Sequence, residues 1–174
     1  MKVLMVADAP SVHTRRWAVS LKAEGVDIVL YSIFPSPDAF FDEHGIRLYV
    51  FDLFTYKQVR GPGRVVSMLG RHREAVGNLK SVILSEHPDI LHAHYATSFG
   101  LIAALTGFHP FVISVWGSDV YEFPEQSVLN KLSVKFIFRR ADRILSTSRV
   151  MAVQTSRYTC KPIDVTPFGV DTEL

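Results

Sequence analysis

The sequence has few of the features that mark several common protein classes. Its 174 residues include one cysteine, Cys160, which excludes an intrachain disulfide and is typical of a reducing compartment. The sequence has no run of about 18 apolar residues, the length that a membrane-spanning helix needs. The apolar run at the N-terminus breaks at Asp8 and is too short for a signal peptide. We therefore expect a cytoplasmic protein.

Several binding motifs are also missing. The net charge of +2 gives no reason to expect nucleic acid binding. The first loop lacks the G-x-G-x-x-G fingerprint, whose glycines let the backbone approach a dinucleotide pyrophosphate, and no G-x-x-x-x-G-K-[ST] motif occurs. These absences argue against a nicotinamide or flavin enzyme and against a P-loop NTPase. We expect no cofactor.

What is present is an alternation of short β-branched runs with helical segments. Nearly half of the residues are apolar, which suits one domain with a full core. The pattern predicts strands over 2–8, 26–32, 46–52, 89–95, 111–116, 143–148 and 163–167. It predicts helices over 11–25, 63–87 (with a break near Gly70), 97–107, 125–141 and 149–159. This alternation indicates an α/β, Rossmann-like, doubly wound and mainly parallel sheet with helices on both faces.

Such a sheet predicts where a ligand would bind. Its usual order places strands three, two and one on one side and strands four and five on the other, and ligands bind where this order reverses. The loops expected there are "ADAPSVHTRR", "HAHYATS" and "WGSDVYEF". They contain most of the unusual polar residues of the chain.

The first of these loops leads into a helix that begins with cations. Arg15 and Arg16 lie in or just before its first turn, where the helix dipole disfavours positive charge. With His13 they could donate hydrogen bonds to an anion. The alternative is that one arginine pairs with a surface carboxylate while the other is solvated.

The second and third loops add hydrogen-bonding groups. His92 and His94 are two apart on a strand and face the same side, but no third ligand stands at a convincing spacing, so we expect no metal. We expect His92 to be packed, and His94 and Tyr95 to line the crevice. Gly117 allows a sharp turn, after which Ser118 and Asp119 could hold sugar hydroxyls; an Asx-type turn without a ligand is the alternative.

A further feature is the basic stretch from Lys57 to Lys80. It contains six cations, one acid and several interleaved apolar residues. Such a helix could lie on an anionic membrane surface. It could equally be the solvated face of an ordinary helix.

Together these motifs resemble the glycosyltransferase family 4 (group 1) enzymes of GT-B fold. The segments that carry the resemblance are "HTRRWAVSLKAEGVDIVLYS", "PDILHAHYATSFGLIAALTG", "SVWGSDVY", "ADRILSTS" and "VTPFGVD". The resemblance implies the N-terminal half of a retaining glycosyltransferase, which transfers a sugar from a nucleotide sugar to a glycan or lipid-linked acceptor. It implies an acceptor-binding domain over 1–166 and, over 167–174, the start of the linker to a missing C-terminal donor-binding domain. We expect the chain alone to be inactive.

The resemblance also assigns roles to residues. It implies an acceptor- or phosphate-binding set of His13, Arg15, Arg16, His94, Tyr95, Trp116, Gly117 and Ser118. Many relatives carry a histidine where this chain has Trp116, which leaves Asp119 as the candidate catalytic group. Two other functions are weighed: half of a UDP-sugar 2-epimerase of the same fold, and a non-catalytic flavodoxin-like binding module.

Overall fold

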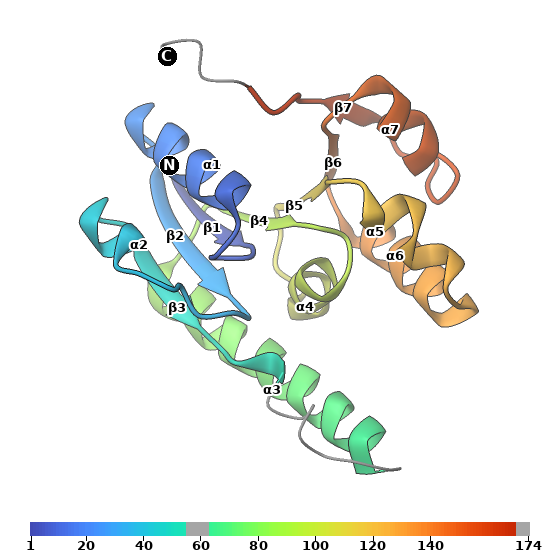
Figure 1. Ribbon diagram of the computed structural model, residues 1–174, viewed down its shortest axis with the longest axis horizontal. Coiled ribbons are helices and arrows are strands. Elements are labelled where there is room, and N and C mark those ends of the chain that lie inside the picture. The colour runs from blue at the N-terminus through green and yellow to red at the C-terminus, as the bar shows by residue number, and fades with distance from the viewer. Residues whose placement is uncertain (55–62, 170–174) are drawn as a thin grey trace.

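The computed structural model describes residues 1–54 and 63–169. The described residues form a parallel sheet of seven strands in the order β3-β2-β1-β4-β5-β6-β7 (Figure 1). The strands are β1 (Lys2–Val6), β2 (Asp27–Ser32), β3 (Arg47–Val50), β4 (Ile90–His94), β5 (Phe111–Val115), β6 (Arg143–Ser146) and β7 (Ile163–Val165). The predicted doubly wound sheet and its reversal between the first and fourth strands are confirmed.

The main helices also follow the prediction. They are α1 (Val12–Ala23), α3 (Gly63–Glu86), α4 (Ser98–Thr106), α6 (Val128–Arg140) and α7 (Arg149–Thr155). The break expected near Gly70 is wrong, because α3 runs through this residue without interruption. Gly70 is exposed and costs the helix about 1 kcal/mol relative to alanine, which the burial of Ala75 and Leu79 on the same helix outweighs.

Three short helical segments are not predicted from the sequence. They are α2 (Phe40–Glu43), α5 (Ser118–Tyr121) and the 3-10 turn η2 (Phe123–Glu125). Segments of three or four residues are too short to show a hydrophobic period. The α2 turn places Phe41 in the core, where it is 1% exposed.

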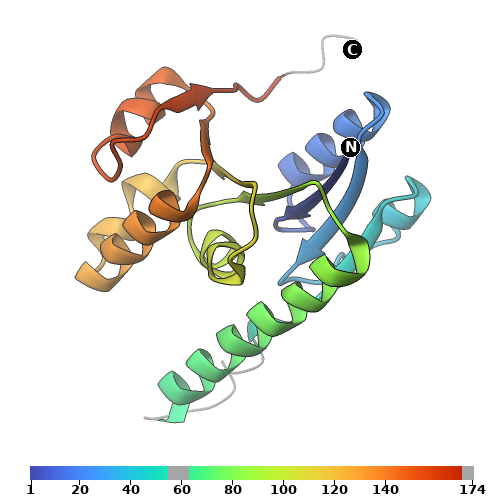
Figure 2. The ribbon, with the colours of Figure 1, turned by 180° about the vertical axis from the view of Figure 1, so that it is seen from behind.

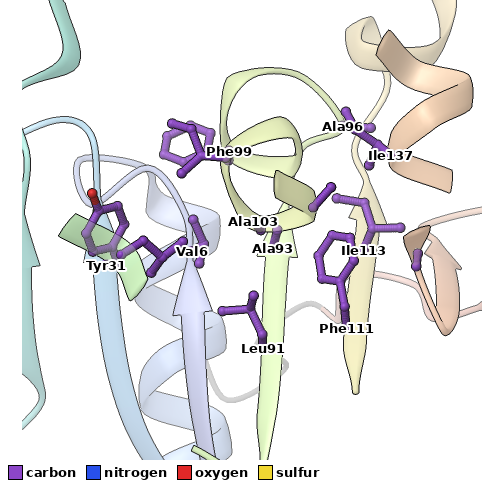
Figure 3. Packing of buried hydrophobic residues seen from close by; sticks show 14 of the residues in the cluster. Val6, Tyr31, Leu91, Ala93, Ala96, Phe99, Ala103, Phe111, Ile113 and Ile137 are labelled. Carbon is purple, nitrogen blue, oxygen red and sulfur yellow. The ribbon is translucent and has the colours of Figure 1, made fainter. Parts of the chain in front are cut away.

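The helices cover the two faces of the sheet with separate cores. On one face, α3, α4 and α6 pack over a large cluster that includes Leu91, Phe99, Phe111, Ile113 and Ile137 (Figure 3). On the other face, α1 and α2 pack over a smaller cluster drawn mainly from β1 and β2. Figure 2 shows α3 in front of β2 and β3, on the face of the sheet that is turned away from the viewer in Figure 1.

The helices differ in how they begin. Ser127 caps α6 by accepting a hydrogen bond from the Asn130 N–H, and Ser148 caps α7 in the same way. The two helices on either side of the reversal, α1 and α4, have neither a side-chain cap nor an acidic residue in their first turn. Their first N–H groups are therefore directed toward the crevice without a side-chain partner.

After β7 the chain crosses back to α1. The Phe168 ring stacks on His13 with centroids 4.5 Å apart, and the Gly169 carbonyl accepts a hydrogen bond from Arg16 at 2.9 Å. The end of the described chain therefore lies beside its first helix.

Candidate functional site

The crevice lies at the carboxyl ends of β1, β4 and β5. It contains a cavity of about 440 Å³, a volume typical of small-molecule sites. The residues that line it come from all three predicted loops and from the β2–β3 side: Asp8, Ser11, His13, Ile33, Phe34, Phe54, His94, Tyr95, Thr97, Ser98, Phe99 and Trp116. The structure therefore brings His13, His94, Tyr95 and Trp116 together.

Several buried polar atoms around this crevice have no hydrogen-bond partner among the described residues. They are Oδ1 of Asp8, both ring nitrogens of His94, and Nε1 of Trp116. The hydroxyl of Thr14 in the first turn of α1 is also buried and unpartnered, but Thr14 does not line the cavity. Buried polar atoms are normally satisfied, since each unpaired one costs about 1–3 kcal/mol. Burial raises the pKa of the Asp8 carboxyl. These unsatisfied atoms lie at the point where the strand order reverses, and this is the usual ligand-binding position in sheets of this type.

The two histidines of β4 differ in their surroundings. His92 is packed as predicted, with its Nε2 2.8 Å from the Ser114 hydroxyl, and burial lowers its pKa to about 4. His94 is 1% exposed and touches Trp17 and Trp116 only through its ring edges and faces. Burial, and then the neighbouring His92, hold the pKa of His94 well below its ordinary value. Both imidazoles are therefore neutral at physiological pH.

Trp116 is the centre of an aromatic group. Its ring lies 5.6 Å from His13, 5.3 Å from His94, 6.4 Å from Tyr95 and 5.4 Å from Phe168, in each case edge to face. Tryptophan offers an apolar face and a single N–H donor. At this position it can bind a sugar ring by contact, but it cannot exchange a proton.

Tyr95 has a strained backbone at the same place. Its φ is +81°, in the left-handed region that non-glycine residues rarely adopt. Its hydroxyl hydrogen-bonds to Ser118, which joins the loop after β4 to the loop after β5. Strain of this kind costs about 1–3 kcal/mol and is found mainly at functional sites. Gly117 supplies the turn before Ser118 with a φ of +136°, as its predicted role requires.

Asp119 lies next to these residues but does not face the cavity. Its side chain has no exposed surface. Its carboxylate accepts hydrogen bonds from the N–H groups of Gly117 (2.8 Å), Trp116 (3.1 Å) and Ala96 (2.8 Å). Burial raises its pKa and these N–H groups oppose the rise. This is not the Asx turn weighed from the sequence, because the bonded N–H groups of Trp116 and Gly117 precede Asp119 instead of following it. The carboxylate is bonded within the chain, where it positions Trp116 and, through Ala96, the loop after β4.

The two arginines are engaged within the chain. Arg15 forms a bidentate ion pair with Asp38, with both N···O distances at 2.9 Å, and lies over the Phe40 ring. Arg16 is exposed and bonds to Gly169, as described above. The pairing of Arg15 follows the alternative weighed from the sequence. A second hollow, of about 290 Å³, runs along α1 between Arg16, Trp17 and Phe168, but the unsatisfied atoms favour the crevice.

The other predicted features are distributed as follows. Among the described residues, no three metal-ligating side chains come together. Within the same residues, no helix combines the length and apolar character needed to cross a membrane. Of the basic stretch, Lys57 and Arg60 lie outside the described residues, and Arg71 bonds to Glu74 and to the Asp52 carbonyl.

Asp8 lines the cavity but is not among the site residues predicted from the sequence. It follows β1 in the first crevice loop, so its place at the end of a strand was a signal that could have found it. The unpartnered hydroxyl of Thr14, which lies outside the cavity lining, gives no such signal, because a threonine inside a helix is ordinarily bonded to its own backbone or solvated.

Comparison with known proteins agrees with the fold. Solved structures similar to this chain include a glycosyltransferase from Rickettsia africae (TM-score 0.68, 17% identity, 98% of this chain and 43% of that one). They also include the Anabaena protein HepE in complex with UDP (0.66, 16%, 98% and 45%), and a Methanocaldococcus jannaschii UDP-GlcNAc 2-epimerase in complex with UDP-GlcNAc and UDP (0.64, 13%, 95% and 46%). The chain thus spans less than half the length of each of these proteins.

The sequence comparison identifies the family. No curated protein matches the chain. The profile of the family described as glycosyl transferase 4-like matches residues 2–148, which is most of the chain and includes all three crevice loops. The chain therefore belongs to the glycosyl transferase 4-like family.

Proposed function

We propose that this chain is the acceptor-side domain of a retaining glycosyltransferase, and that its crevice holds a sugar by its hydroxyl groups. The full reaction would transfer a sugar from a nucleotide sugar to a glycan or lipid-linked acceptor. The observation that supports this proposal is the set of unsatisfied polar atoms of Asp8, His94 and Trp116 around one cavity.

The chemistry of these atoms favours hydroxyl groups over phosphate. The Asp8 carboxylate only accepts hydrogen bonds, the Trp116 N–H only donates, and a neutral His94 does one of each. A hydroxyl group both donates and accepts, so a polyhydroxylated ring can satisfy all of them. A phosphate dianion has no proton to give to Asp8 and would be repelled by it. At Arg15 a phosphate would have to compete with Asp38.

In this proposal the residues of the crevice bind and orient the acceptor. One acceptor hydroxyl donates its hydrogen bond to Asp8, while the Trp116 N–H and His94 fix neighbouring hydroxyls. In the transfer step the bond between the donor sugar and its diphosphate breaks. The acceptor oxygen forms the new bond at the same carbon, and its proton passes to an oxygen of the departing diphosphate. The diphosphate would be held by a donor-binding domain, so we expect the chain alone to transfer no sugar.

A 2-epimerase half is the second candidate, because solved UDP-GlcNAc 2-epimerases share this fold over 95% of the chain. An epimerase acts on the nucleotide sugar itself and needs no acceptor. The segment "PFGVD" after "ADRILSTS" resembles the transferases, which is why we place transfer first.

The test is binding of an uncharged sugar to the purified chain. The chain has two tryptophans, so the W17F variant leaves Trp116 as the single tryptophan, whose fluorescence can be excited selectively over that of tyrosine. We expect methyl hexopyranosides or disaccharides to change its fluorescence saturably, and H94L to weaken the affinity at least tenfold. The control is H44L, an exposed histidine of the α2 region. Thermal melts show whether each variant is folded.

Each outcome has a defined meaning. Saturable binding of neutral sugars that H94L weakens and H44L leaves unchanged supports the proposal. Binding of UDP or inorganic phosphate in the crevice, with no response to neutral sugars, contradicts it. Tight binding of UDP-GlcNAc alone would favour the epimerase.

A further inference from the structure

The α6 helix exposes large apolar side chains that do not take part in its packing against the core. Val128 is 74% exposed, Leu129 77% and Leu132 56%. The helix already buries Val134 and Ile137 against the main core, so its inward face is complete. Single exposed apolar residues are common, but three that are neighbours on one helix form a patch that water does not favour.

A row of cations runs beside this patch. Lys131, Lys135 and Arg139 are four residues apart and so lie above one another on the helix, and all three are exposed. Among the described residues none of them has an ion-pair partner. No acidic residue occurs from Gln126 to Ala141; Glu122 and Glu125 precede the helix.

The apolar patch lies toward the crevice end of the molecule. Strands β5 and β6 are parallel, and α6 connects the carboxyl end of the first to the amino end of the second. The helix therefore runs antiparallel to them, and its N-terminal residues Val128, Leu129 and Leu132 lie at the edge of the sheet where the crevice opens. Figure 1 shows α6 on the opposite side of α4 from α3, at the outside of the fold.

We infer that this face of α6, made of Val128, Leu129, Leu132, Lys131, Lys135 and Arg139, docks on an anionic lipid surface. Charge complementarity selects this occupant. Apolar side chains beside a row of lysine and arginine match the boundary between acyl chains and anionic headgroups. A second copy meeting the same face would place cations against cations. The inference is independent of the proposed sugar site, although it would bring the crevice close to a lipid-linked acceptor.

The experiment is sedimentation of the 174-residue chain with vesicles of phosphatidylcholine and phosphatidylglycerol, and with phosphatidylcholine alone, at low and high salt. We expect binding to the anionic vesicles that falls severalfold as salt screens the charges. The variant V128S/L129S/L132S removes the apolar patch and K131E/K135E/R139E reverses the cation row. Each should lower vesicle affinity at least tenfold, and all six positions are exposed enough for the fold to tolerate the change.

The matched control is L69S/L84S on α3, where Leu69 is 62% and Leu84 71% exposed. This control also tests the basic stretch that the sequence singled out. The inference would be overturned if the α3 variant lost vesicle binding while the α6 variants kept it. It would also be overturned if the wild-type chain did not bind anionic vesicles, or bound neutral vesicles equally well. A wild-type dimer in solution that the α6 variants dissociate would show that a second copy covers this face, and would also overturn it.

Discussion

The two ends of the sheet differ in whether buried polar side chains have hydrogen-bond partners. At the amino end, Glu86 is 4% exposed and both of its carboxylate oxygens have partners. It accepts a hydrogen bond from the Tyr49 hydroxyl at 2.7 Å, and its other oxygen lies 2.7 Å from Arg47 and 3.3 Å from Lys2. At the carboxyl end, Asp8, Thr14, His94 and Trp116 keep buried atoms without partners.

This difference separates buried polar groups that stabilise the fold from buried polar groups that the fold leaves without a hydrogen-bond partner. Glu86 ties the end of α3 to β1 and β3, so its charges serve the structure. The carboxyl end also contains a buried carboxylate that serves the fold, Asp119, which accepts hydrogen bonds from backbone N–H groups. Its neighbours in the crevice are not bonded, although they lie in the same loops. The contrast is therefore between roles and not simply between the two ends.

The largest expected effect is at the amino end. The variant E86A should destabilise the chain by about 3 kcal/mol, because it removes a buried carboxylate with three partners and leaves Tyr49 without its acceptor. Urea denaturation measures the change in the free energy of unfolding. The control is E74A, which removes an exposed i,i+3 pair with Arg71 and should cost less than about 0.5 kcal/mol. Equal effects of the two variants would break the comparison.

The sequence predicted most of the fold because its signals are periodic. The strands of β1, β2, β4 and β5 are continuous apolar runs, and the helices between them are long enough to show a repeat. What it could not predict depends on other elements. Whether Gly70 breaks α3 is decided by packing of the residues around it. The α2 helix is a single turn whose fully buried residue is Phe41.

The sequence predicted where the site residues lie better than it predicted what each of them contacts. His13, His94, Tyr95 and Trp116 line the cavity because the topology brings three loops to one place. The partner of Arg15 is Asp38, 23 residues away, and no local pattern indicates that pairing. Whether Asp119 faces a ligand or the backbone depends on the rotation of one turn, which the letters "WGSD" do not specify.

The second prediction uses pH to separate the two ends. His92 has a pKa of about 4 in the folded chain against an ordinary value of 6.5, so the unfolded chain binds a proton that the folded chain does not. Stability should therefore fall as pH drops from 7 to 5, by about 2 kcal/mol at pH 5 from His92 alone. His94, whose pKa is also held well below its ordinary value, adds to this loss.

The amino end should respond in a different range. Burial would raise the pKa of Glu86, but the bonds from Tyr49 and Lys2 and the charge of Arg47 hold it below its ordinary 4.5. Its contribution is present above that value and is lost only as pH falls below it. Unfolding free energies from pH 7.5 to 3.5 should show the two ranges, and H92Q should reduce the loss of stability in the upper range only. H44Q is the control for a lost histidine; a profile that H92Q leaves unchanged would contradict the assignment.

The smallest expected effect tests the unsatisfied atoms directly. Thr14 is fully buried in α1 and its hydroxyl has no partner. Valine has nearly the same shape without the hydroxyl, so T14V should leave packing intact and remove the cost of burying an unbonded group. We expect a gain in stability of about 1 kcal/mol. The matched control is T155V, because Thr155 is equally buried but donates a hydrogen bond to the Met151 carbonyl at 2.8 Å; it should lose about 1 kcal/mol. Opposite signs for these two Thr→Val substitutions would show that the unbonded Thr14 hydroxyl lowers the free energy of unfolding, whereas the bonded Thr155 hydroxyl raises it. If T14V destabilises as much as T155V, the Thr14 hydroxyl has a partner in solution, and the contrast at this residue is lost.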